Sequence, residues 1–72
     1  MSGGALNYQY QVLYNLAGDI EKTTPNRIKL IEILELVAKA CHDIEWVDSG
    51  DYAPGDEDEA INEVIKYCKE LE

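Results

Sequence analysis

The sequence is short of several features that small proteins use for stability or targeting. Its 72 residues include only two cysteines, Cys41 and Cys68, whose spacing matches no disulfide framework. No apolar run approaches the roughly 20 residues that span a bilayer, and no secretory h-region is recognisable. We therefore expect a cytoplasmic protein without a membrane partner, whose cysteines are reduced core residues. One bridge between two antiparallel helices remains the alternative.

Basic residues are also scarce. Six lysines and arginines face fifteen acids, giving a net charge of −9, and residues 49–72 alone carry eight acids and two bases. Because nucleic acids and anionic lipids bind through clustered Lys and Arg, this charge argues against direct nucleic-acid or membrane binding. It permits a basic protein partner, although charge that keeps a small protein soluble is the plainer interpretation.

Residues with metal-binding or catalytic chemistry are too few to define a site. Residues 48–59 have the length of a calcium loop, but Gly50, Tyr52 and Ala53 stand where that loop needs carboxylates and glycine. One histidine and two distant cysteines make a weak case for zinc, and spacing defines no nucleophile–base pair. We expect no metal, no cofactor and no enzymatic activity.

What the sequence does contain is helical periodicity. Apolar residues recur at three- and four-residue spacing in three segments, which predicts an all-α fold. We expect helices at about 5–22, 25–47 and 57–71, in one small domain that spans residues 1–72 and has a long central helix. The alternation from Tyr8 to Tyr14 offers a strand instead, but no hairpin partner follows it. Asn7 or Ser2 is the expected cap of the first helix.

Residues that typically start or end helices indicate the limits of the second and third helices. Thr24 and Pro25 suit the N-cap and the first position of the second helix. Gly50 suits the C-terminal end of that helix. Asp56, with Glu59 three residues later, resembles a capping box and predicts the start of the third helix.

The central segment is apolar over more than one stripe. Its apolar positions are Ile28, Leu30, Ile31, Ile33, Leu34, Leu36, Val37, Ala38, Cys41, Ile44 and Val47. A helix with so wide an apolar surface needs cover on two sides, and one short helix on each flank supplies only part of it. Because a chain of this size has a thin core, we expect a second subunit to supply the rest, so a homo-oligomer is predicted.

The densest group of functional side chains lies at the end of this segment. His42 and Trp46 are four residues apart and share a helix face. Trp46 could stack a flat ligand while His42 forms hydrogen bonds to it. The structural alternative is that Trp46 anchors the helix junction and His42 caps carbonyls near a helix end.

A second candidate lies at the N-terminus, where Ser2, Gly3 and Gly4 precede the first helix. Glycine backbone and the unpaired N–H groups of a helix start make a usable phosphate site. A flexible tail would have the same sequence. Arg27 and Lys29 form the only cluster of bases and could assist.

Two motifs together resemble a family of very small proteins encoded by phages and prophages. One is Ser2-Gly3-Gly4 with Tyr8 downstream. The more specific one is His42-Asp43-x-Glu45-Trp46-x-x-Ser49-Gly50-Asp51-Tyr52. The acidic last third departs from the basic, aromatic final helix of that family, so no role of that helix carries over. The resemblance implies a phage context, in which small non-catalytic proteins bind a component of the bacterial host.

These observations give one principal hypothesis, a non-enzymatic binding protein that antagonises host defence by sequestering a nucleotide-derived signal. Ser2, Gly3 and Gly4 would hold phosphate, Tyr8 and Trp46 would stack a base, and His42 and Asp51 would bond base or ribose. The predicted ligand-binding residues also include Arg27, Ser49 and Gly50. One alternative is an acidic module, an inhibitor or nucleic-acid mimic, that docks on a basic host protein. The other is a structural homodimer without a ligand.

Overall fold

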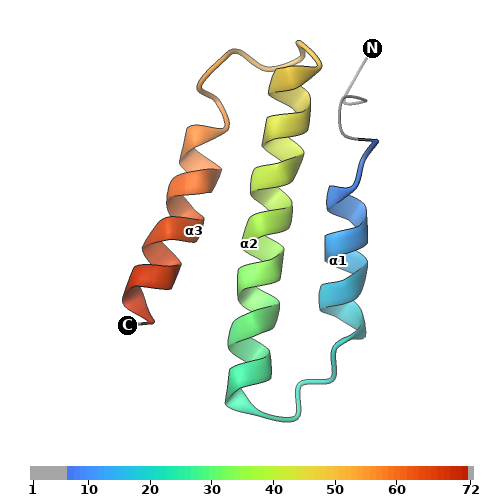
Figure 1. The fold of residues 1–72 in the computed structure, drawn as a ribbon, viewed down its shortest axis with the longest axis vertical. Helices are drawn as coiled ribbons and strands as arrows, with labels where there is room; N and C mark the ends of the chain where they lie inside the picture. Colours follow the sequence, from blue (N-terminus) through green and yellow to red (C-terminus); the bar gives the residue numbers. More distant parts are fainter. Residues whose placement is uncertain (1–6, 72) are drawn as a thin grey trace.

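The computed structural model describes residues 7–71, which form three α-helices joined by two short connections (Figure 1). They are α1 (Tyr10–Asp19), α2 (Pro25–Asp48) and α3 (Asp58–Glu70), and residues 7–71 contain no strand. The predicted all-α fold with a long central helix is confirmed. The strand alternative is wrong, because the chain is helical from Tyr10 onward.

The first helix is shorter than predicted at both ends. Asn7 and Tyr8 have φ values of 58° and 57°, a left-handed conformation that interrupts a right-handed helix. The N-cap is Gln9, without a side-chain hydrogen bond, so the predicted Asn7 cap is wrong, and the alternative, Ser2, lies outside the described residues. At the other end, Ile20 is already extended, with ψ at 124°.

The second helix begins as the sequence predicts. The Thr24 side chain accepts a hydrogen bond from the Arg27 N–H at 3.2 Å, and Pro25 occupies the first turn. The helix ends at Asp48, followed by Ser49 and then by Gly50 with φ of 86°. The predicted glycine terminator is therefore confirmed, because this conformation costs glycine little and other residues more.

The third helix begins at Asp58, and the predicted capping box is wrong. The N-cap is Glu57 in helical conformation, with no side-chain cap. The Asp56 carboxylate instead accepts the Ala53 N–H at 2.9 Å, and that of Glu57 accepts the Gly55 N–H at 2.8 Å. Both acids thus stabilise the turn that precedes the helix.

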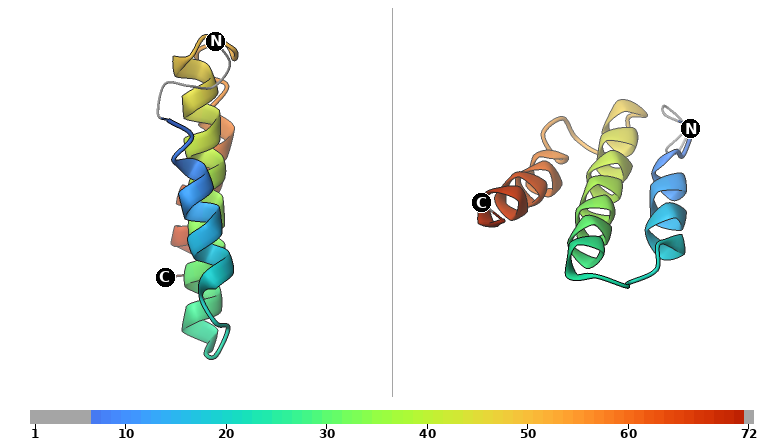
Figure 2. Two further views of the ribbon diagram at one scale, coloured as in Figure 1. Left: turned by 90° about the vertical axis from the view of Figure 1, so that its right-hand side faces the viewer. Right: turned by 60° about the horizontal axis from the view of Figure 1, so that its bottom comes forward.

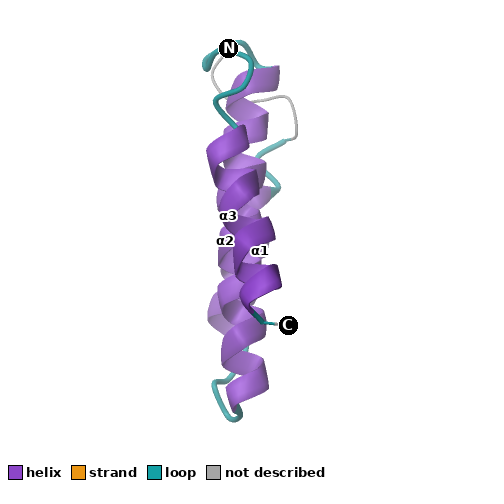
Figure 3. Cartoon of the chain, turned by 90° about the vertical axis from the view of Figure 1, so that its left-hand side faces the viewer, coloured by secondary structure: helices purple, strands orange, loops and turns teal. Residues whose placement is uncertain are grey.

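The three helices lie side by side in one layer. α2 packs against both α1 and α3 in antiparallel fashion, whereas α1 and α3 do not contact each other (Figure 1). The molecule measures 40 × 25 × 10 Å, so it is about one helix diameter thick. The left view of Figure 2 and the view of Figure 3, turned by 90° to either side, show the helices nearly superimposed.

The buried core of this layer is made almost entirely of small residues. The buried apolar residues are Ala17, Ile31, Ala38, Ala40 and Ala60. Small side chains let the helix backbones approach closely, but they remove little apolar surface from water. Cys41 is half-buried and Cys68 is exposed, and both thiols are free. The prediction that both cysteines are core residues is therefore wrong for Cys68.

Candidate functional site

Five aromatic rings meet at the end of the layer where α2 finishes. We call this group the aromatic cluster; its members are Tyr8, Tyr10, His42, Trp46 and Tyr52. The central pair is His42 and Trp46, one helical turn apart on α2. Their rings stack with centroids 4.1 Å apart and planes at 20°. The prediction that these two side chains share a face is confirmed.

The N-terminal rings reach this pair because α1 runs antiparallel to α2, which brings the start of α1 to the end of α2 (Figure 1). Tyr10 meets His42 edge-on, with centroids 4.9 Å apart, and Trp46 at 5.8 Å. Tyr8 meets Trp46 edge-on at 6.1 Å. Edge-to-face contacts of this kind are a favoured geometry for aromatic rings. Tyr8 and Trp46, both predicted site residues, are therefore neighbours.

The loop after α2 supplies the fifth ring. The Trp46 carbonyl accepts hydrogen bonds from the Asp51 N–H at 2.9 Å and from the Tyr52 N–H at 3.2 Å. These bonds turn the chain back over the last turn of α2, and they depend on the left-handed Gly50. The Tyr52 ring then lies 6.4 Å from His42 and 6.5 Å from Trp46. The backbone of the predicted site residues Gly50 and Asp51 thus closes the helix beside the cluster.

A buried carboxylate lies beneath the cluster. Glu45 is fully buried, and its Oε2 accepts the Tyr8 N–H at 2.9 Å. Its Oε1 has no hydrogen-bond partner among residues 7–71. Buried polar groups normally have partners, so Glu45 is the most unusual residue of this region. It holds the left-handed Tyr8 in place and so positions the Tyr8 ring.

Sequence reasoning did not single out Glu45 as a site residue, although a signal for it exists. Ile31, Ala38 and Glu45 are spaced by seven residues along α2, and all three are buried. A glutamate that continues an apolar stripe at helical spacing is out of place on a solvated face. That position indicates a buried carboxylate with a specific partner.

The local electrostatics of the cluster are acidic. His42 Nδ1 lies 3.0 Å from Asp43 Oδ1, a contact that orients the imidazole. This contact replaces the predicted alternative in which His42 caps helix carbonyls. Glu45 and Asp51 add further carboxylates nearby. The cluster therefore suits the neutral, aromatic part of a ligand better than an anionic part.

Two groups of predicted site residues do not join the cluster in the described structure. Arg27 lies in the first turn of α2, nineteen residues before Trp46, or about 28 Å along the helix at 1.5 Å per residue. Its guanidinium donates to the Glu21 carbonyl at 3.4 Å. Within one chain, Arg27 therefore does not join the aromatic cluster. Ser2, Gly3 and Gly4 lie outside the described residues.

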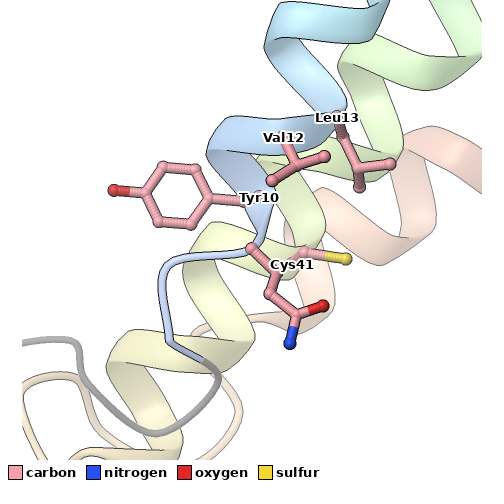
Figure 4. Close-up of a pocket in the computed structure, with 5 residues that line it drawn as sticks. Tyr10, Val12, Leu13 and Cys41 are labelled. Atoms are coloured by element: carbon pink, nitrogen blue, oxygen red, sulfur yellow. The ribbon is translucent and has the colours of Figure 1, made fainter.

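A shallow cavity of about 290 Å³ adjoins the cluster between α1 and α2. It is lined by Gln9, Tyr10, Val12, Leu13 and Cys41. Figure 4 shows Val12, Leu13 and Cys41 around it, with the Tyr10 ring extending away from Leu13 and Cys41. Most of the lining side chains are apolar, so this cavity suits an apolar group.

Other kinds of site receive no support from the described residues. Between residues 7 and 71, no three His, Cys, Asp or Glu side chains are grouped so that they could hold a metal ion. None of the three helices combines the length and apolar character that crossing a membrane requires. Comparison with protein-family models, with curated protein sequences and with solved structures finds no match to this chain.

Proposed function

We propose that this protein is a non-enzymatic binding protein that holds a nucleotide-derived ligand at the aromatic cluster. The observation that supports this best is the convergence of Tyr8, His42 and Trp46 from segments separated by more than thirty residues. All three were selected from sequence as ligand-binding residues. A purely structural anchor would not need a histidine stacked on the tryptophan at the centre of the group.

The geometry favours recognition of a flat base. His42 alone stacks flat on Trp46, whereas Tyr8 and Tyr52 contact it at steep angles of 73° and 45°. Tyr8 and Tyr52 as residues remain about two-fifths exposed, at 41% and 38%. Exposed rings at two sides of a central indole can hold a planar ligand by stacking, which contributes roughly 1–3 kcal/mol per base.

Phosphate recognition in this proposal is assigned to Ser2, Gly3 and Gly4. Among the described residues the bases lie elsewhere. Three of them lie near the opposite end of α2: Lys22, Arg27 and Lys29. Lys39 is paired with Glu63, and the remaining two, Lys66 and Lys69, are on α3. The base would therefore carry most of the recognition at the cluster, with backbone N–H groups of the N-terminal segment on the phosphate.

The biological proposal follows from the resemblance to phage and prophage proteins. A protein that binds a nucleotide signal without converting it lowers the free concentration of that signal. In a bacterial host this would blunt a defence response that depends on the signal. Sequestration predicts that bound ligand is recovered chemically unchanged when the complex is denatured.

The test is native mass spectrometry of protein purified gently from cells, repeated after incubation with mono-, di- and cyclic nucleotides. We expect a stoichiometric nucleotide adduct on the wild type, a much weaker one on Trp46→Leu, and an unaffected one on Tyr67→Phe. Tyr67 is the matched control because it is a tyrosine on α3, outside the cluster. Equal binding by Trp46→Leu, or no adduct across the panel, would refute the proposal.

A second candidate function rests on the charge of the third segment. Residues 51–56 are exposed, and Asp58 and Glu59 occupy the first turn of α3. An acidic module would use this region to dock on a basic host protein. Its binding would fall steeply with salt and with Asp58→Asn and Glu59→Gln. Asp56 and Glu57 are less suitable for this test, because their carboxylates hold the preceding turn.

A further inference from the structure

Polar and apolar side chains lie on opposite broad faces of the single layer of helices. One stripe along α2 is charged and consists of Glu32, Glu35 and Lys39. The Lys39 ammonium forms an ion pair with the Glu63 carboxylate of α3, with Nζ and Oε2 3.2 Å apart. On α3, Lys66 and Glu70 continue the same side, since with Glu63 they line one depression. These residues define what we call the polar face.

The opposite side of α2 is entirely apolar over most of its length. Residues two apart in a helix lie about 200° around it, so Val37 and Cys41 point away from Glu35 and Lys39. The full stripe on this side is Leu30, Ile33, Leu34, Val37, Cys41 and Ile44. It carries no charged residue between Leu30 and Ile44.

Both outer helices continue this apolar side. Val12 of α1 lines the same cavity as Cys41, which places Val12 and Leu16, four residues on, beside the α2 stripe (Figure 4). On α3, Ile61, Ile65 and Cys68 lie opposite Glu63, Lys66 and Glu70 by the same spacing. We call the combined surface of the three helices the apolar face.

The described residues leave much of the apolar face open to solvent. Val12 is 64% exposed, Leu16 47%, Leu30 48% and Ile65 47%. Stable domains pack at least two layers of secondary structure around a core, and this chain supplies one layer. Figures 2 and 3 show nothing stacked on either side of the three helices among the described residues.

We infer that the apolar face packs against the same face of a second copy of this chain, so that two layers of three helices form one domain. The area fits this occupant. A face of 40 × 25 Å is roughly 1,000 Å², and a stable interface buries about 800 Å² per partner.

The thin core of one chain argues that the partner is a second copy of this chain rather than a different protein. A layer whose buried apolar residues are four alanines and one isoleucine has little stability before it is covered. The covering partner must therefore be present whenever the chain is made, and another copy always meets that condition. Such a pair is self-complementary about a two-fold axis.

The distribution of charge permits this association. Each copy carries −9, which would oppose contact through the acidic regions. The apolar face excludes charge along the central helix, so the two copies meet where repulsion is weakest. Raising the salt concentration screens the remaining repulsion and tightens the pair, which is opposite to the response of a complex between an acidic and a basic protein.

The experiment measures the mass of the purified protein in solution, by light scattering after size-exclusion chromatography and by sedimentation equilibrium. We expect the wild type at twice the 8.1 kDa chain mass, with an unfolding midpoint that rises with protein concentration. A folded wild-type monomer, or a midpoint independent of concentration, would overturn the inference.

A matched pair of substitutions identifies the face. Leu30 and Ile28 are apolar residues two positions apart on α2, 48% and 40% exposed, but they lie on opposite sides of it. We expect Leu30→Glu to halve the mass or to unfold the chain, while Ile28→Glu leaves the mass unchanged. Both outcomes for Leu30→Glu support the interface, because a charge at an exposed position of an isolated chain would do neither.

Ile65→Glu serves as a second probe on a different helix, since Ile65 is 47% exposed. We expect the same loss of mass, which places α3 in the interface as well. If Leu30→Glu and Ile65→Glu keep the wild-type mass, or if Ile28→Glu dissociates the protein as strongly as Leu30→Glu, the assigned face is wrong.

Discussion

The two seams of α2 are built from different chemistry. The α1–α2 seam contains interleaved aromatic rings and a buried carboxylate, Glu45, that fixes a left-handed tyrosine. The α2–α3 seam contains the buried Ala60 and exposed polar contacts, Lys39 with Glu63 and Tyr67 with Glu32. Exposed ion pairs contribute little to stability. The first seam therefore specifies both structure and the candidate site, and the second mainly orients α3 against α2.

We expect the largest loss of stability from Trp46→Ala. This substitution removes the ring that contacts the other four members of the aromatic cluster. Because Trp46 is half-buried, we expect a loss of about 2–4 kcal/mol in the free energy of unfolding, somewhat less than for a fully buried aromatic residue. Denaturant unfolding at one fixed protein concentration measures it. A loss below that of a substitution in the α2–α3 seam would reverse the ranking of the seams.

The next largest loss of stability is expected at Glu45, where two substitutions separate its role as a hydrogen-bond acceptor from its role as a buried charge. Glu45→Ala leaves the Tyr8 N–H without an acceptor, and we expect a loss of about 1–3 kcal/mol. Glu45→Gln keeps an acceptor for Tyr8 and removes a buried charge whose Oε1 lacks a partner, so it should be nearly neutral. The chemical shifts of the Tyr8 and Trp46 ring protons report whether the pair survives. Equal damage by both substitutions would show that the charge itself is needed.

On the other seam, pH provides a probe. The Tyr67 hydroxyl donates to the Glu32 carboxylate, which raises the pKa of Tyr67 from 10.0 to about 12. A raised pKa means that the folded state keeps a proton that the unfolded state loses. The contribution of this contact is therefore complete below pH 10.0 and is lost as pH rises to about 12. Tyrosinate absorbance should show a late-titrating tyrosine in the wild type that is absent in Tyr67→Phe.

The smallest effect is expected from Lys39→Ala. The Lys39 ammonium and the Glu63 carboxylate are 49% and 38% exposed, and solvent screens such pairs. The pKa of Lys39 is raised by its hydrogen bond to Glu63 and by the charge of that residue, so the ammonium keeps its proton at neutral pH. We expect no measurable change in the unfolding midpoint. A clear destabilisation would show that the α2–α3 seam depends on this contact more than its exposure implies.

Much of the fold follows from local sequence signals. Thr24, Pro25 and Gly50 mark the limits of α2 because each acts through its own backbone geometry, which sequence reveals directly. The start of α1 does not follow from such signals. It is set by a hydrogen bond from Tyr8 to Glu45, a partner 37 positions away in the chain. A contact of that range overrides local helix propensity: the periodicity of α2 indicates that Glu45 is buried, but it does not reveal that the partner is Tyr8.

The candidate site was predicted to a similar degree. His42 and Trp46 were placed correctly because they lie on one helix, where spacing fixes their relation. Arg27 was assigned to the site on charge alone, and the length of α2 separates it from the cluster. Tyr10 and Tyr52 join the cluster through an antiparallel pairing and a backbone turn, which residue types alone do not reveal.

The absence of contact between α1 and α3 has a consequence for folding. Each helix packs only on its neighbour along the chain, as repeats do in a solenoid. Most contacts within one chain therefore span two adjacent segments, and topologies of this kind fold rapidly because little loop entropy is lost before contacts form. Because α2 belongs to both helical hairpins, either the α1–α2 hairpin or the α2–α3 hairpin can form first. Within one chain, the sequence of each outer helix can also change without having to fit the other.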